Sequence, residues 1–151
     1  MKVFLASDHA GFKLKEFVKK LLEEKGFEVR DFGTNSEQSC DYPDFIIPCS
    51  EAVAESNGQA LGIVFGGSGI GEEIAANKVK GIRCAFAYDL FTAKVTREHN
   101  DSNMLALGGR TITADENLAK EIVLAWLSTP FSGDERHKRR IQKISDYENR
   151  V

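Results

Sequence analysis

The chain has little cysteine, little net charge and no long apolar run. Its three cysteines, Cys40, Cys49 and Cys84, form no CxxC pair, and no histidine-rich stretch lies beside them. An odd number of scattered cysteines argues against a disulfide framework and against a zinc site, so a reducing, cytoplasmic compartment is expected. We interpret all three thiols as structural.

The other absences exclude classes of partner. A net charge of −3 gives the chain no overall attraction for nucleic acid or for an anionic membrane. The apolar run at residues 3–6 ends before Asp8 and is too short for the core of a signal peptide, and no other run approaches a membrane span. We therefore expect neither nucleic acid nor a membrane as a partner.

The composition that is present is typical of a folded globular protein. Hydrophobic residues make up 42% of the chain and charged residues 28%, which excludes a disordered protein. A length of 151 residues allows one core of ordinary size but not two, so residues 1–151 are expected to form a single domain.

Short apolar runs alternate with helical patterns along the whole chain. The runs, expected as strands, cover residues 2–6, 27–32, 60–65, 83–88 and 103–108. Helices are expected around residues 14–24, 43–54, 70–77, 89–97, 115–128 and 135–147, with Asp89 as a cap and Gly26 as a stop. Apolar strands separated by helices predict a parallel sheet with both faces covered, and hence an α/β fold.

In such folds ligands bind where the strands end. The turns at that edge read "SDHAG", "DFGT" to "CDYPD", "GGSGIGEE" and "GGRT". Each is polar or rich in glycine, so the site is expected where these turns meet.

The glycine-rich turn at residues 66–71 is neither of the two common nucleotide motifs. It lacks the Lys-Ser/Thr pair of a Walker loop, and its G-x-G-x-G spacing after the third strand is not that of a dinucleotide fingerprint. Its backbone N–H groups can still hold a phosphate or a developing oxyanion. Ser68 can act there as a helix cap, and Glu72 and Glu73 either interact with the helix dipole or include a catalytic base.

Two motifs that contain histidine also allow either a structural or a functional interpretation. Asp8 and His9 can form a hydrogen-bonded structural turn, but this turn lies on the ligand side of the sheet. His99, followed by Asn100, ends the fourth helix and can simply bind its last carbonyl groups.

The basic run "RHKRRIQK" near the C-terminus is usually the sign of a solvated helix face. Arg136 and Arg140, however, are four residues apart and share one face of the expected helix. Two guanidinium groups in that arrangement can hold one phosphate.

Taken together, seven stretches resemble the ribose-5-phosphate isomerase B family, which also includes galactose-6-phosphate and allose-6-phosphate isomerases. They are "ASDHAGFKLKE", "DFGT", "DYPDF", "GGSGIGEEIAANKVKGIRCA", "REHND", "LALGGR" and "RHKRRI", in that order. The resemblance implies a Rossmann-like three-layer α/β/α sandwich with a five-stranded parallel sheet and a C-terminal helix. It also implies a phosphosugar aldose–ketose isomerase without a metal or other cofactor, built as a homodimer or a dimer of dimers.

The resemblance also implies a role for each site residue. Many relatives carry a cysteine base where this chain has Gly66, and the branch with "GGSG" uses the glutamate that corresponds to Glu72. Glu72 is then the base, Ser68 relays a proton, and Asp8 with His99 opens the sugar ring. Substrate-binding roles fall to Gly67, Gly69, Ile70 and Gly71 through their backbone, to Tyr42 and Asn100 at the sugar, and to His9, Arg110, Arg136 and Arg140 at the phosphate.

The implied reaction interconverts ribose 5-phosphate and ribulose 5-phosphate through a cis-enediolate. His99 is expected to reach the Glu72 pocket of a partner subunit, so that each active site is shared between two chains. Three alternatives stay open: an isomerase of allose or galactose 6-phosphate, a non-catalytic sugar-phosphate sensor, and a nucleotide-binding module.

Overall fold

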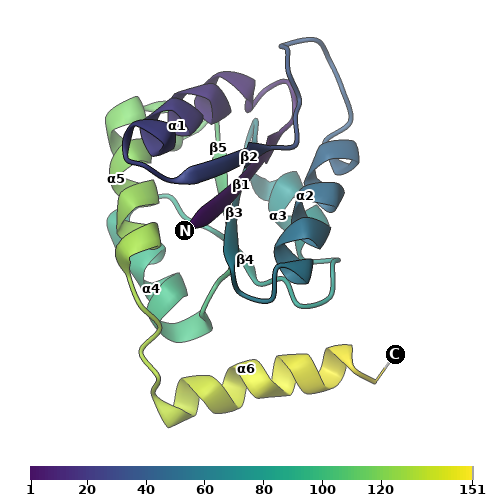
Figure 1. Ribbon diagram of the computed structural model, residues 1–151, viewed down its shortest axis with the longest axis vertical. Coiled ribbons are helices and arrows are strands. Elements are labelled where there is room, and N and C mark those ends of the chain that lie inside the picture. The colour runs from purple at the N-terminus through teal and green to yellow at the C-terminus, as the bar shows by residue number, and fades with distance from the viewer. Residues whose placement is uncertain (151) are drawn as a thin grey trace.

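The computed structural model describes residues 1–150 and builds them around one parallel sheet (Figure 1). Its strands are β1 (Lys2–Ser7), β2 (Glu28–Asp31), β3 (Ala60–Gly66), β4 (Cys84–Phe86) and β5 (Met104–Gly108), in the order β2-β1-β3-β5-β4. Every pairing between neighbours is parallel. The predicted five-stranded parallel sheet is therefore confirmed.

Helices cover both faces of this sheet. On one face, α1 (Phe12–Glu24), α4 (Leu90–Asn100) and α5 (Glu116–Ser128) enclose a core that includes Val3 and Leu5 of β1. On the other, α2 (Pro43–Glu55) and α3 (Ile70–Ala76) enclose Phe4 and Ala6. Successive residues of β1 thus enter opposite cores, as the two-residue period of a strand requires. The predicted three-layer α/β/α arrangement is confirmed.

Local sequence explains where the helices begin and end. Asp89 caps α4 by accepting a hydrogen bond from the Thr92 N–H at 2.7 Å. After α1, Gly26 has a φ of 82°, a conformation that glycine adopts at little cost. The two edge strands β2 and β4 are shorter than predicted, since each pairs on one side only. A short 3₁₀ turn, η1 (Ile112–Ala114), was not predicted.

The register of the central strands places three loops at one point. Ser7 of β1 is paired with Phe65 of β3, and Gly66 of β3 with Gly108 of β5. β1 and β3 therefore end side by side, and the connections that leave them run toward opposite edges of the sheet. This is the position at which doubly wound sheets bind ligands.

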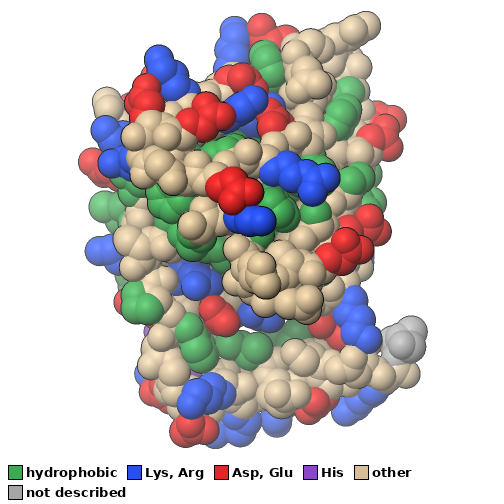
Figure 2. All heavy atoms as spheres, viewed as in Figure 1, with side chains coloured by type: hydrophobic (Ala, Val, Ile, Leu, Met, Phe, Trp, Pro, Cys, Tyr) green, Lys and Arg blue, Asp and Glu red, His purple; other side chains and the backbone are tan. Residues whose placement is uncertain are grey.

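The last helix, α6 (Glu135–Glu148), lies apart from the three layers, across the end of the molecule where the strands begin (Figure 1). A groove of about 430 Å³ separates it from the ends of α3 and α4, with Ile141 and Ile144 on its α6 side. Hydrophobic side chains appear on the side of α6 that faces this groove, and charged ones on the outer side (Figure 2). An amphipathic helix that covers so little of its own chain has an apolar surface left to cover.

No helix within residues 1–150 combines the length and the apolar composition needed to cross a membrane.

Candidate functional site

The loops after β1, β3 and β5 are joined by backbone hydrogen bonds. The Asp8 N–H donates to the Phe65 carbonyl at 3.1 Å, the Gly109 N–H to Gly66 at 2.7 Å, and the Arg110 N–H to Gly67 at 2.9 Å. Asp8, the glycine-rich turn and Arg110 are thereby fixed to one another. The sequence prediction that these turns meet at the carboxyl edge of the sheet is confirmed.

Glu72 is the buried carboxylate of this edge. Its side chain is 3% exposed, and a Cβ added to Gly66 would lie 2.0 Å from its Cδ atom. The carboxylate therefore rests directly against the backbone at Gly66, where any larger residue would displace it. Burial raises the pKa of Glu72 above its ordinary value of 4.5, and the negative charge of Asp8 acts in the same direction. Such a carboxylate is suited to accept a proton from a weakly acidic carbon.

Glu73, one residue further along α3, faces elsewhere. Its Oε1 accepts a hydrogen bond from the Phe86 N–H at 3.1 Å. That contact ties α3 to the end of β4. The neighbouring glutamates therefore have different surroundings, and Glu73 has a structural partner.

Asp8 and Ser68 flank the glutamate from two loops. Asp8 Oδ1 accepts hydrogen bonds from the N–H groups of Ala10 and Gly11 at 2.8 and 2.9 Å. Ser68 is exposed, and its Oγ accepts from the Ile70 N–H at 3.2 Å. The N-cap position of α3 belongs to Gly69, whose φ is 83°. Ser68 therefore lies one residue before the N-cap position, where the left-handed backbone favours glycine, and its hydroxyl still accepts from the first N–H of the helix.

His9 and Arg110 line a hollow of about 250 Å³ beside this turn, together with Lys13 and Glu37. His9 Nδ1 accepts a hydrogen bond from the Cys40 N–H at 3.3 Å. The ring proton then lies on Nε2, which can donate to an anion. An imidazole donor and a guanidinium at one hollow are suited to bind phosphate.

Tyr42 closes the other side of the glycine-rich turn. It stands at the N-cap position of α2, and a Cβ added to Gly71 would lie 3.0 Å from its Cζ atom. Within the same turn, Ile70 has a side chain that is 54% exposed. The carboxyl edge thus brings together most of the predicted site residues: Asp8, His9, Tyr42, Gly67, Ser68, Gly69, Ile70, Gly71, Glu72 and Arg110.

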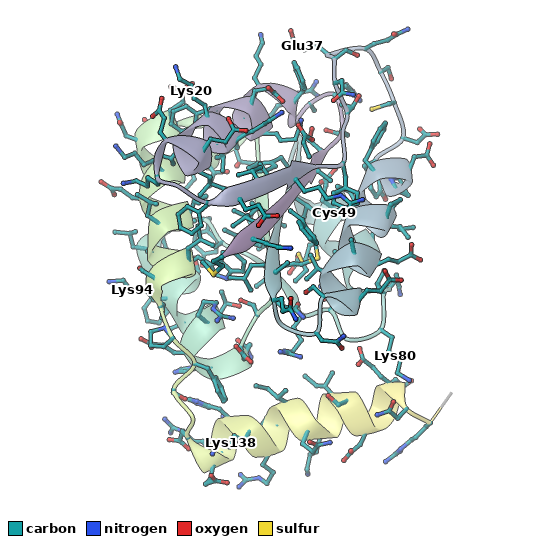
Figure 3. The ribbon with its side chains drawn as sticks, in the orientation of Figure 1. Lys20, Glu37, Cys49, Lys80, Lys94 and Lys138 are labelled. Atoms are coloured by element: carbon teal, nitrogen blue, oxygen red, sulfur yellow. The ribbon has the colours of Figure 1, made fainter. Side chains whose placement is uncertain are left out.

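The other four predicted residues form a second group at the amino edge. His99 and Asn100 lie in the last turn of α4, and Asn100 lines the groove beside α6 together with Arg140. Arg136 Nε is paired with Asp134 at 3.2 Å at the start of α6. Helices in this fold run from the carboxyl edge back to the amino edge. Figure 3 shows the separation: Lys138 on α6 and Glu37 lie at opposite ends of the molecule. One chain does not bring the two groups together.

Two side chains near the predicted residues were not anticipated. Cys40 is half-buried with its Sγ atom 4.0 Å from His9 Nδ1, whereas Cys49 and Cys84 are buried. His137 is buried, and its ring centroid lies 4.2 Å from that of His99. His137 shares the helix face of Ile141 and Ile144, and that spacing could have identified it as an inward residue.

A buried lysine was also missed. Lys15 is fully buried and donates to Asp31 Oδ2 at 2.6 Å, while Asp31 Oδ1 accepts from the Gly33 N–H at 2.9 Å. Partial burial opposes ionisation of Asp31, but the hydrogen bonds from Lys15 and Gly33 lower its pKa below 3.8. The pair fixes the start of the loop that carries Cys40 and Tyr42. Lys15 is three residues before Val18 and seven before Leu22, and this spacing places it on the apolar face of α1.

Across the part of the chain that the structure describes, no group of three or more His, Cys, Asp or Glu side chains could hold a metal ion.

Fold and site together define a class: an α/β protein that binds an anionic ligand at the carboxyl edge of its sheet, beside a buried carboxylate. Residues 3–144 match the Ribose/Galactose Isomerase family model, and the chain belongs to that family. It is 47% identical to ribose-5-phosphate isomerase B of Mycolicibacterium paratuberculosis, over 98% of this chain and 92% of the relative.

Two solved structures show the same fold over nearly the whole chain. Ribose-5-phosphate isomerase B of Clostridium thermocellum has a TM-score of 0.94 at 45% identity, covering 99% of both chains. The Mycoplasma genitalium enzyme, solved with bound ribulose-5-phosphate, has a TM-score of 0.94 at 38% identity, covering 99% of this chain and 97% of that one.

Proposed function

We propose that this chain is a ribose-5-phosphate isomerase that interconverts ribose 5-phosphate and ribulose 5-phosphate through a cis-enediolate, with Glu72 as the base. The observation that carries the proposal is the Glu72 carboxylate, which is buried against Gly66 with a raised pKa. The identity of the substrate is inferred from the relatives, because one of them was solved with bound ribulose-5-phosphate.

In the proposed reaction, Asp8 and His99 move the protons that open the furanose ring. Glu72 then removes the C2 proton of the open-chain aldose, and the electron pair forms the enediolate. Ser68 carries a proton from the C2 oxygen to the C1 oxygen, and Glu72 returns its proton to C1 to give the ketose. These proton transfers balance by themselves, so the step consumes no oxidant or reductant.

The negative charge that develops on the enediolate oxygen must be stabilised by hydrogen-bond donors. The backbone N–H groups of Gly67, Gly69, Ile70 and Gly71 are the proposed oxyanion hole, and each donor in comparable sites is worth about 3 kcal/mol. Tyr42 and Asn100 hold the sugar hydroxyls. Because only the transition state carries the full oxyanion charge, these donors raise the rate more than they tighten substrate binding.

We propose that binding of the phosphate group positions the reacting carbons of the sugar. His9 and Arg110 bind it from one side, and Arg136 and Arg140 from the other. Binding energy from a group that does not react can align C1 and C2 with the base.

We further propose that the enzyme is a homodimer whose partner supplies His99, Asn100, Arg136 and Arg140 to each pocket. In support, these four residues lie at the amino edge of their own chain, away from Glu72. Exposed apolar side chains also concentrate on α3, the turn after β4, the start of α4, η1 and α6: Ile70, Ile74, Tyr88, Leu90, Phe91, Ile112, Ile144 and Tyr147. A second copy would cover them and complete both sites by symmetry. The cysteine usage supports a cytoplasmic setting.

The deciding experiment incubates the purified protein in heavy water with ribose 5-phosphate, allose 6-phosphate or galactose 6-phosphate. It measures turnover and the uptake of deuterium for each sugar. Turnover of ribose 5-phosphate is expected, with deuterium at C1 of the ribulose 5-phosphate that forms and at C2 of the ribose 5-phosphate that is recovered. Preferred turnover of a 6-phosphate sugar would reassign the substrate within the family. Binding of all three sugars without turnover or exchange would instead identify a sensor.

A further inference from the structure

The contact between α4 and α6 is built around two histidine rings. His137 is the one buried side chain of α6, and its ring lies 4.2 Å from that of His99 at an interplanar angle of 34°. His137 Nδ1 is 2.8 Å from Ser132 Oγ. The ring that touches the proposed ring-opening residue is therefore itself fixed by a hydrogen bond.

Ser132 connects this pair to both helices. Its N–H donates to the Glu98 carbonyl of α4 at 3.1 Å, and its Oγ accepts from the Asp134 N–H at 3.2 Å. With that N–H bond accepted, the Ser132 hydroxyl can donate its own proton to His137 Nδ1. Burial lowers the pKa of His137 below its ordinary value of 6.5, and the neighbouring His99 and Arg136 act in the same direction.

The rest of α6 is held to its own chain by little else. At its far end Glu148 Oε2 accepts from the Gly81 N–H at 3.3 Å, and between the two ends lies the groove of about 430 Å³. The two tilted rings are therefore the main contact that fixes His99 relative to α6.

We infer that His137 is a positioning residue: its ring, held by Ser132, orients the His99 imidazole for the proton transfer that opens the sugar ring. This inference rests on the proposed function, because it assigns His137 to one step of that reaction. A purely structural role would be different. In that case His137 would anchor α6 and its arginines, and every step that needs bound phosphosugar would depend on it.

The substrates themselves separate the two roles. Ribose 5-phosphate is mostly a closed furanose, so its turnover requires ring opening. Ribulose 5-phosphate stays open, because the oxygen that would close its five-membered ring carries the phosphate. Exchange of its C1 proton with heavy water therefore reports on Glu72 and the phosphate contacts, without the ring-opening step.

The experiment compares His137→Ala, His137→Phe and Ser132→Ala with Lys138→Ala, a neighbouring exposed residue of α6 that pairs with Glu135. We expect His137→Ala to lower kcat for ribose 5-phosphate about 10-fold or more, since small misplacements of a reacting group are costly. Its KM and the C1 exchange rate of ribulose 5-phosphate should stay within about 2-fold. His137→Phe, which keeps a flat ring against His99, should recover most of the loss, and Lys138→Ala should match the wild type.

Equal losses in turnover and in exchange would overturn the inference and make His137 an anchor of α6. A raised KM with unchanged kcat would overturn it as well, since it would move His137 to the phosphate site. If His137→Ala does not fold, as judged by circular dichroism and mass in solution, Ser132→Ala decides the question, because it removes the hydrogen bond that holds the His137 ring. It should lower kcat for ribose 5-phosphate while leaving the C1 exchange rate of ribulose 5-phosphate within about 2-fold, and equal losses in both would again overturn the inference. Absence of both turnover and exchange in the wild type would refute the proposed function instead.

Discussion

At the residue scale, two neighbouring glutamates of α3 face different surroundings because successive helix positions are rotated by about 100°. Glu72 lies against Gly66 with its side chain buried, and Glu73 accepts a hydrogen bond from Phe86. Only a carboxylate at the meeting point of the three loops can reach a ligand bound there. The two residues therefore form a matched pair for testing the base.

Glu72→Gln keeps the shape of the side chain but cannot accept a proton at neutral pH. We expect turnover of ribose 5-phosphate to fall by about 10²–10⁴-fold or more while phosphosugar binding survives. Glu73→Gln should be nearly silent, since the amide oxygen can still accept from the Phe86 N–H. Steady-state kinetics and calorimetric binding measure both effects. The reverse result, a silent Glu72→Gln and an inactive Glu73→Gln, would refute the assignment.

The buried carboxylate also affects stability. Burial raises the pKa of Glu72 above 4.5, so the folded state holds this proton more tightly than the unfolded state does. The stability that the protonated group contributes is present below pH 4.5 and is lost as the pH rises through the folded pKa. We therefore expect Glu72→Gln to melt at a higher temperature than the wild type at pH 7, with the difference shrinking toward pH 4.5. A constant difference across this range would contradict the shift.

Local sequence pointed to the turns that meet at the carboxyl edge, but not to the surroundings of each candidate residue. The spacing alone could not choose between Glu72 and Glu73, and the choice came from the resemblance to a family. Lys15 was missed because its burial depends on Asp31, 16 positions away. His137 was missed because it lies within a basic run that is typical of a solvated helix face. Its contact with His99 depends on how α6 packs against α4, which the sequence does not show.

At the element scale, the helices and central strands were predictable because their signals are local. Caps such as Asp89 and stops such as Gly26 lie within a few residues of the boundary that they set. The lengths of β2 and β4 were not predictable, because they depend on which strands become edges, and strand order is a property of the whole sheet.

The position of α6 leads to a prediction about the phosphate contacts. Arg136→Ala and Arg140→Ala should each raise KM for ribose 5-phosphate by about 10-fold or more, because each removes a proposed charge-assisted contact to the phosphate. Both should matter little for any residual activity on free ribose. Lys138→Ala is the matched control, since residue 138 lies on the opposite side of the helix from 136 and 140. Equal losses on ribose and on ribose 5-phosphate would make α6 a folding element only.

At the scale of the whole molecule, the two groups of site residues lie at opposite edges of one sheet. His99 ends α4 at the amino edge, while Glu72 begins α3 at the carboxyl edge. A two-fold partner can place its amino-edge group over the carboxyl-edge group of the first chain, and the same operation completes the second site. Activity of the proposed enzyme should therefore depend on pairing.

Mixing two inactive variants tests the shared site. Glu72→Gln and His99→Asn proteins, unfolded together in equal amounts and refolded, should form mixed dimers in about half of all pairings. Each mixed dimer has one pocket with both defects and one with neither, so activity should return to about a quarter of the wild-type value. Each variant refolded alone serves as the control, and native mass spectrometry confirms the mixed species. A pocket contained within one chain would give no recovery at any mixing ratio, and confirmed mixed dimers without activity would refute the shared site.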